Sequence, residues 1–465
     1  MRLFHLVSMV SLFAILTCSA SAEEQYLKFL QGLREKNYHD TALQYLDQIS
    51  ADKETPKEIK ELIPFERAMT LMVFSRTQKL PKDQEKTLNL ALAQLELFTK
   101  QSPNHPKAGT ANTERGKIIL EKAEVEVRKS QSPAEGNKKE YQAAARKLVA
   151  QARAIFQKAY NLHEKTWKSF PATFIDKQKE PKKYKARAIS EIKFMSAQLD
   201  LAQCTYAEAQ TYDPGSADFN RLLGKASEEY AKIHERYRSQ VGGLYARMWQ
   251  GKCFEEQGEL GRALGIYNEL LGHPGKSPPI KQLKDNILQF RLICLNDEKR
   301  KDYQLVINEA EQWLRENRTR NRTAIGQGIT WELSRAQESL ANIEGTKKTD
   351  QERILRQALT NARFVNAFRG KFRDVSRLMV GRINARLQGN SGGDPKDFET
   401  AYGLGQDRIK QTKSLKDKVA AAKSATAKKK AQVELKQFME ETARILKIAL
   451  KLASPKTDPK ELDHS

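Results

Sequence analysis

The sequence predicts an all-α protein in which short helices stack on one another. The composition supports this, because good helix formers dominate the 465 residues while aromatic residues make up only 8%. Apolar residues recur at spacings of three and four, and alternating β-branched runs are scarce. Helix pairs joined by tight turns cannot bury their apolar faces alone, so each pair must pack on its neighbours. With 39% hydrophobic residues, the chain can form one large core or several domains.

The clearest helix pair covers residues 244–274. A turn at residues 257–259 separates its two helices, and Pro274 ends the second. Small residues at Gly251 and Ala263 would let the helices approach closely, and aromatic residues would fill the space beside them. The positions that carry this pattern are Gly251, Phe254, Ala263, Tyr267 and Leu270. Helix 216–240 repeats the spacing with Ala226, Tyr230 and Ile233.

This pattern resembles the tetratricopeptide repeat, clearly over residues 216–274 and more faintly over 24–49 and 83–130. The resemblance implies a right-handed superhelical solenoid of antiparallel helix pairs, irregular where helices are long. Members of the family bind other proteins in a concave groove lined by the first helix of each pair. Arg247 and Gln250 depart from the family pattern, which favours large apolar residues there.

By the same resemblance, four residues of the first helix are expected to face a partner-binding groove. They are Tyr245, Arg247, Lys252 and Glu255. The alternative is that they are ordinary solvated residues on a helix surface.

Periodicity and Pro or Gly breaks place the other helices. A first pair is expected over 24–49, with Asp40 as N-cap of its second helix, and Pro64 is expected to interrupt the helix 57–79. The remaining helices are predicted at 83–100, 107–130, 138–170, 182–212, 280–296, 302–317, 322–344, 350–369 and 371–388, with two more in 396–453.

These helices suggest five segments. They are a signal peptide (1–22), N-terminal helix pairs (23–130), a long-helix segment (131–240), a solenoid (241–390) and Lys-rich C-terminal helices (391–465). The last segment is where further repeats would follow if the array continued beyond Ser465.

The N-terminus has the features of a secretory signal. Arg2 precedes an apolar stretch over residues 3–16, and Ala20-Ser21-Ala22 is a typical cleavage site, with cleavage after Ala22. The predicted location is therefore periplasmic or secreted. An uncleaved anchor and a lipoprotein attached through Cys18 are the alternatives.

Three cysteines remain after cleavage: Cys204, Cys253 and Cys294. Each lies in an apolar, helical context, so they are interpreted as buried core residues. One disulfide with a leftover thiol is the alternative. The sequence contains no Cys-x-x-Cys pair, so it indicates neither a zinc site nor a redox site.

The mature chain would carry 80 Lys and Arg against 58 Asp and Glu, a net charge of +22. Such a charge favours acidic proteins, anionic polysaccharide or lipid headgroups, with nucleic acid unlikely outside the cell. Basic residues concentrate in 318–386 and 410–436. In the first of these, Phe364, Phe368 and Phe372 fit either a polyanion surface or, preferentially, a core stripe.

No catalytic motif or metal-ligand spacing is present. His105, His234 and His273 have no suitable neighbours, and the adjacent carboxylates Glu255–Glu256 and Glu440–Glu441 are interpreted as solvated surface. We therefore expect no enzyme activity, cofactor or metal. The first hypothesis is a protein-binding scaffold. The alternatives are a basic solenoid that binds anionic polysaccharide or membrane headgroups and, with little support, a hydrolase.

Overall fold

The computed structural model describes residues 25–78, 81–131, 137–368, 372–387, 394–422 and 424–453. Within them every regular element is a helix, and none is a strand, so the predicted all-α class is confirmed. The predicted signal peptide, including Arg2 and the site after Ala22, lies outside the described residues and stays a prediction.

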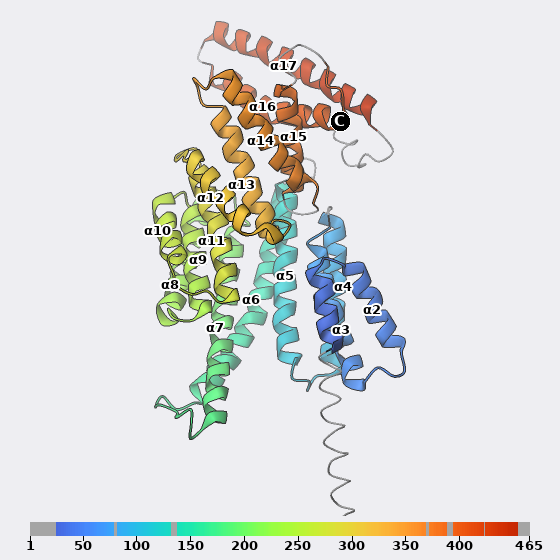
Figure 1. Cartoon of the computed structure of the whole chain (residues 1–465), viewed down its shortest axis with the longest axis vertical. Coiled ribbons are helices and arrows are strands. Elements are labelled where there is room, and N and C mark those ends of the chain that lie inside the picture. The colour runs from blue at the N-terminus through green and yellow to red at the C-terminus, as the bar shows by residue number, and fades with distance from the viewer. Residues whose placement is uncertain are drawn as a thin grey trace, which may run out of the picture. The chain divides into compact units, whose positions relative to one another are not determined.

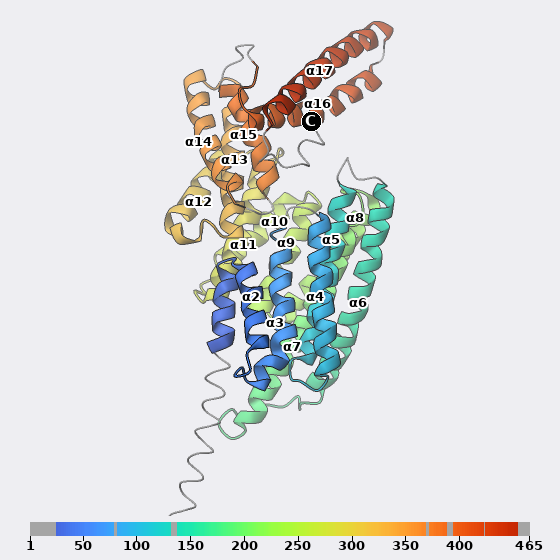
Figure 2. The same ribbon diagram turned by 90° about the vertical axis from the view of Figure 1, so that its right-hand side faces the viewer.

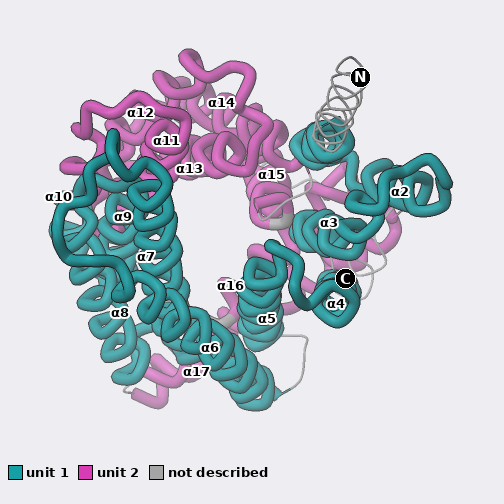
Figure 3. Tube along the Cα trace, turned by 90° about the horizontal axis from the view of Figure 1, so that it is seen from below, with its two compact units in different colours: residues 1–266 teal, residues 267–465 magenta. Residues whose placement is uncertain are grey.

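The chain forms two compact units, residues 1–266 and 267–465 (Figure 3). After a helical segment at residues 25–35, unit 1 contains α2 to α9 and the start of α10 (Figure 1). Their bounds are α2 His39–Ala51, α3 Lys57–Ser75, α4 Pro81–Gln101, α5 Ala108–Ser130, α6 Lys138–Lys168, α7 Pro181–Ala209, α8 Ala217–Arg236, α9 Val241–Glu256 and α10 Leu260–Leu271.

Unit 2 begins at Tyr267 inside α10 and continues to the end of α17. Its remaining elements are α11 Pro278–Asn296, α12 Tyr303–Glu316, the 3₁₀ turn η1 Arg318–Arg320, α13 Ala324–Ala341, α14 Lys348–Asn366, α15 Arg373–Leu387, α16 Phe398–Ala421 and α17 Ala425–Leu452. The division between the units falls within the predicted solenoid segment 241–390. The predicted domain boundaries stay predictions.

Within each unit, a helix packs mainly on the helices before and after it in the chain. In unit 1, α3, α4, α5 and α6 lie side by side in this way (Figure 2). Odd-numbered helices also contact one another, as α5 contacts α7, α7 contacts α9 and, in unit 2, α11 contacts α13. In unit 1, α5, α7 and α9 therefore form an odd-numbered layer of their own, and α11 and α13 are neighbours in unit 2. This is the arrangement expected of stacked helix pairs.

The positions identified as structural in the sequence lie in the core. Tyr230 and Tyr267 are only 1% and 0% exposed, and the smaller Ala226 and Ala263 are fully covered. Gly251, Phe254 and Leu270 are buried as well. Burial of this set agrees with the structural role expected of it, while its identity as a tetratricopeptide repeat remains a prediction.

Local capping explains several helix starts. The side chains of Ser216, Thr323, Asp397 and Ser424 each accept a hydrogen bond from a backbone N–H in the first turn of α8, α13, α16 and α17. The predicted cap at Asp40 is wrong. Helix α2 begins at His39 with Tyr38 at the N-cap, and Asp40 lies in the first turn, where its charge suits the helix dipole.

A helix boundary at Pro64 is also ruled out, because α3 runs from Lys57 to Ser75 with Pro64 inside it. Proline lacks the N–H that would bind the carbonyl four residues earlier. The neighbours Ile63 and Phe65 are only 7% and 6% exposed, so burial of the surrounding apolar face offsets the lost hydrogen bond.

Two glycines set a close helix crossing in unit 2. A Cβ atom added to Gly403 of α16 would lie 2.9 Å from the Cα atom of Gly381 in α15. A Cβ atom added to Gly381 would meet Gly403 at 2.8 Å. The two backbones can therefore touch only because neither residue has a side chain.

We predict that Gly403→Ala lowers the free energy of unfolding by about 1–3 kcal/mol, because the new methyl group forces α15 and α16 apart. Urea unfolding followed by circular dichroism measures this. The matched control is Gly265→Ala, since a Cβ atom added at Gly265 meets no atom within 4 Å. It should be neutral or slightly stabilising. Equal stability of the two variants would contradict the tight-crossing argument.

Candidate functional site

The four residues predicted to face a groove lie on α9, an odd-numbered helix. Glu255 is only 9% exposed. The Lys252 ammonium forms one ion pair with the Glu255 carboxylate and a second, at 3.4 Å, with the Glu256 carboxylate. Burial alone would lower the pKa of Lys252, but the two carboxylates outweigh it and raise the pKa. Tyr245 and Arg247 are half-buried, and Arg247 donates to Gln250 at 2.8 Å. A groove-lining role for these four residues stays a prediction.

The interpretation of Glu255–Glu256 as solvated surface is wrong. Glu256 accepts a hydrogen bond from the Tyr206 hydroxyl and another from the Gln210 side-chain amide, each at 2.5 Å. Tyr206 lies in the last turn of α7 and Gln210 is the C-cap residue that follows it, so the end of this helix presents two donors to one carboxylate of α9. Burial and the nearby Glu256 charge raise the pKa of Tyr206 well above its usual value. This polar contact joins two helices of the odd-numbered layer.

An aromatic cluster continues this contact into the core. Trp249 of α9 packs edge-on against Tyr206, with ring centroids 5.2 Å apart, and stacks on Tyr230 of α8 at 6.3 Å. The Tyr230 hydroxyl donates to Gln203 at 3.0 Å. Every polar group named here has a partner inside the fold, so the cluster fixes the positions of α7, α8 and α9. Among the described residues, no group of three or more potential metal ligands occurs.

Asp200 of α7 is a half-buried carboxyl near Lys117 and Glu114 of α5. Burial raises its pKa to about 6; Lys117 lowers the pKa and Glu114 raises it, both to a smaller extent. Ionising this group therefore opposes folding. The neutral carboxyl carries no such penalty. Its contribution to the stability of the folded state is therefore fully present below pH 3.8, the usual pKa, and is lost as the pH rises through about 6.

We predict that Asp200→Asn stabilises the protein at pH 8 by about 2–3 kcal/mol, since the amide carries no charge to desolvate. The gain should fall as the pH is lowered and should vanish near pH 3.5, where the wild-type carboxyl is neutral in both folded and unfolded states. Urea unfolding of the two proteins across this pH range is the measurement. A pH-independent difference would contradict the assignment.

The three cysteines of the described chain are buried thiols that form no disulfide with one another, as the sequence indicated. Cys204 and Cys253 are 0% exposed and belong to neighbouring core clusters of unit 1, and Cys294 is equally covered in unit 2. Burial raises the pKa of Cys204 to about 12 and raises that of Cys253 as well. These thiols therefore contribute to packing, and little of either is present as reactive thiolate.

We predict that a mature chain starting at residue 23 does not react with a thiol reagent such as DTNB while folded, and reacts at all three cysteines in denaturant. The absorbance of the released product counts the thiols. Rapid labelling of the native protein would show that one of these sites opens.

A small cleft of about 220 Å³ lies between α13 and α15 in unit 2, beside Trp331 and Arg382. Arg382 binds both carboxylate oxygens of Glu338, at 2.7 and 2.6 Å, and also contacts Asp407 at 3.2 Å. The Arg382 guanidinium is thus paired with carboxylates of the same protein. Nearby, Phe372 stacks on Trp331, while Phe364 and Phe368 pack edge to face at 5.0 Å. These half-buried rings fit packing better than an open polyanion surface.

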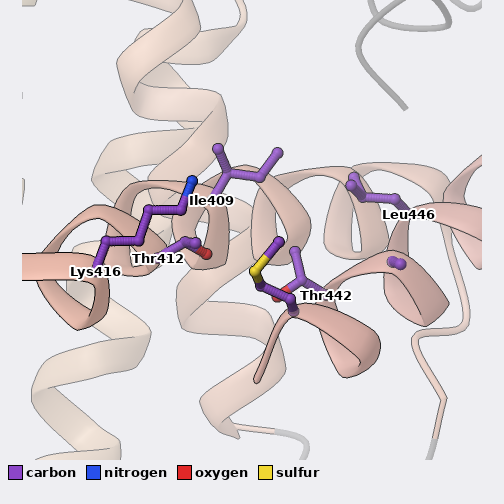
Figure 4. A pocket seen from close by; sticks show the side chains of 7 residues that line it. Ile409, Thr412, Lys416, Thr442 and Leu446 are labelled. Atoms are coloured by element: carbon purple, nitrogen blue, oxygen red, sulfur yellow. The ribbon is translucent and has the colours of Figure 1, made fainter. Parts of the chain in front are cut away.

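The larger groove of unit 2 runs between α16 and α17 and has a volume of about 420 Å³ (Figure 4). Lys416 lies at one end and Leu446 at the other (Figure 4). The lining residues are Ile409, Thr412 and Lys416 from α16, and Met439, Thr442, Ala443 and Leu446 from α17. Ile409 and Met439 are 44% and 46% exposed, so the groove presents apolar side chains to solvent.

Several contacts hold the two helices of this groove together. Ile445 and Ala449 are buried between them, and Leu446 packs directly over Gly405. The Arg408 guanidinium lies 4.2 Å from the centre of the Phe438 ring and donates to Thr442 at 3.3 Å. The groove therefore has a defined floor beneath its exposed apolar rim.

Five apolar residues of α17 recur at spacings that alone would suggest one apolar stripe: Leu435, Phe438, Met439, Leu446 and Leu450. The structure divides this set. Ile445 and Ala449, which the stripe did not include, are 3% and 0% exposed, whereas Met439 and Leu450 are 46% and 44% exposed. The spacing of Met439, Ala443, Leu446 and Leu450 along one helix face is the signal that reveals the exposed groove side.

No family model matches this chain, and no curated protein matches its sequence. Among the described helices, none is long and apolar enough to cross a membrane.

Proposed function

We propose that this protein is a non-enzymatic, tetratricopeptide-like scaffold of the cell envelope or secreted space, and that its α16–α17 groove binds an acidic amphipathic segment of another protein. The exposed apolar lining of the groove is the observation that carries this proposal. Amphipathic helices commonly bind in such grooves through apolar residues one turn apart.

The position of α17 supports the proposal. Within the described chain, α16 is the one helix against which α17 packs extensively. One face of α17 is thus covered, while Met439 and Leu450 are left in solvent. An apolar patch of this kind, rimmed by polar residues, is typical of an interaction site.

The net charge of the two groove helices and the residues between them indicates the chemistry of the partner. Residues 398–453 contain thirteen Lys and Arg against six Asp and Glu, a net charge of +7. Lys428, Lys429 and Lys430 are exposed at the start of α17, and Lys447 and Lys451 are exposed towards its end. Together with Lys416 in the groove lining, this net positive charge would attract an acidic segment.

We predict that Met439→Glu reduces retention of the partner by about tenfold or more, because it places a charge in the apolar groove and repels an acidic segment. The measurement is a pull-down from envelope extract with the mature chain, washed at low and then high salt and quantified by mass spectrometry. A photo-crosslinking residue at position 439 would then identify the bound segment.

The matched control is Val433→Glu, which changes a 52% exposed apolar residue of the same helix outside the groove lining. It should retain the partner. Equal loss in both variants would contradict binding in the groove. Recovery of only heterogeneous anionic material, lost at high salt, would instead support the alternative function of binding anionic polysaccharide or membrane headgroups.

A further inference from the structure

The loop between α6 and α7, residues 169–180, forms an exposed tip at one end of unit 1. Figures 1 and 2 show it in green, beyond the ends of the neighbouring helices of that unit. Phe174 in this loop is 86% exposed, more than any other large apolar residue found exposed in the described chain. A Phe side chain left in water forgoes the free energy of burial, so a surface that covers this ring would gain that free energy on binding.

The exposure of Phe174 is fixed by contacts on both sides of it. The next residue, Ile175, is only 3% exposed and anchors the loop in unit 1. The preceding residue, Thr173, accepts a hydrogen bond from Arg187 at 2.8 Å through its carbonyl. The Asp176 carboxylate accepts hydrogen bonds from the backbone N–H groups of Gln178 and Lys179 at 2.7 and 3.2 Å. The loop therefore holds the phenyl ring outward.

The base of the tip is held by aromatic packing. Trp167 near the end of α6 stacks on Phe194 of α7, with ring centroids 5.7 Å apart. The guanidinium of Arg236 lies 4.6 Å from the Trp167 ring and 5.5 Å from the Phe194 ring. These contacts tie the two helices of the tip to each other and to α8, so the tip can present Phe174 without a large ordering cost.

Lysines surround the exposed ring. Residues 165–185 contain seven lysines and two acids, Asp176 and Glu180, a net charge of +5. All seven lysines are exposed: Lys165, Lys168, Lys177, Lys179, Lys182, Lys183 and Lys185. Asp176 already binds the loop backbone, Glu180 pairs with Lys183 at 3.1 Å, and Glu164 of α6 pairs with Lys168 at 3.0 Å. Most of the positive charge therefore faces solvent around Phe174.

Further apolar residues lie on the two helices of the tip, each with lysines about one turn away. On α6, Leu162 is 60% exposed and lies between Lys158 and Lys165. On α7, Ile189 and Ile192 are 44% and 53% exposed, near Lys185 and Lys193. Apolar side chains interspersed with lysines are characteristic of surfaces that lie at a membrane interface.

We propose that the α6–α7 tip binds the surface of an anionic lipid bilayer, with Phe174 inserted at the interface and the lysines on the headgroup phosphates. A protruding tip suits a broad surface better than a pocket in a protein, and its positive charge complements anionic lipid. Attachment of this kind needs no membrane-spanning helix. It is independent of the α16–α17 groove, so either proposal can fail without the other.

The test is cosedimentation of the mature chain with vesicles of phosphatidylglycerol and phosphatidylcholine in equal parts, compared with pure phosphatidylcholine. We expect binding to the mixed vesicles that weakens with salt, and little binding to the neutral ones. Phe174→Ala should weaken binding about tenfold, and the double change Lys182→Ala and Lys183→Ala by at least as much at low salt. Phe29→Ala, at an exposed Phe elsewhere in unit 1, should bind as the wild type does.

A conservative variant gives a second readout. Phe174→Trp should keep the binding, and its fluorescence, after subtraction of the wild-type signal, should shift to shorter wavelength with the anionic vesicles as the indole leaves water. Circular dichroism establishes that each variant is folded. Equal binding by wild type and Phe174→Ala, or equal binding to neutral vesicles, would overturn the proposal. A third outcome would also overturn it: the protein is retained on heparin, Phe174→Ala leaves this retention unchanged, and no vesicles are bound. That result would assign the tip to binding anionic polysaccharide.

Discussion

Most helices of the described chain bury their apolar faces mainly against the helices that precede and follow them, and the rest of the structure depends on that constraint. The packing of α5 on α6, of α8 on α9 and of α16 on α17 are examples. Two of the places where apolar surface is left uncovered follow from this constraint. One is the last helix of the described chain, α17, which has α16 as its main neighbour. The other is the tip of a helix pair that is longer than the helices beside it, such as α6 and α7 with 31 and 29 residues. Both candidate binding surfaces arise for this reason.

The helices were predictable from the sequence because local signals and tertiary packing agree almost everywhere. Residues 182–212 were expected to form one helix, and α7 extends from Pro181 to Ala209; the turn at 257–259 falls between α9 and α10 as expected. Pro64 is an instructive exception. The local rule for proline predicts a break, but burial of the surrounding residues keeps α3 continuous. Where local and tertiary preferences conflict, the sequence alone does not reveal which is stronger.

The candidate surfaces were less predictable because they depend on which helix faces lie opposite each other. The neighbouring positions of Glu255 and Glu256 suggested a solvated surface, but Tyr206 and Gln210 lie fifty and forty-six residues earlier and supply hydrogen bonds to Glu256. Phe174 lay within a stretch that reads only as a break between helices. Its signal was the short apolar run of Phe174 and Ile175 among lysines, and only the fold separates the buried residue of that pair from the exposed one.

The two basic residue types have different roles in the described structure. Arginines commonly join helices: Arg34 binds Glu66, Arg153 binds Glu208, Arg291 binds Glu309 and Arg382 binds Glu338. A guanidinium suits this role because its planar set of donors matches a carboxylate. The lysines of residues 165–185 and 428–430 are instead exposed. Much of the arginine charge is therefore balanced inside the fold, including in the basic segment 318–386, where Arg320, Arg335 and Arg382 all pair with acids. Attraction of an anionic partner then depends chiefly on the lysine segments, and these lie beside the two exposed apolar surfaces.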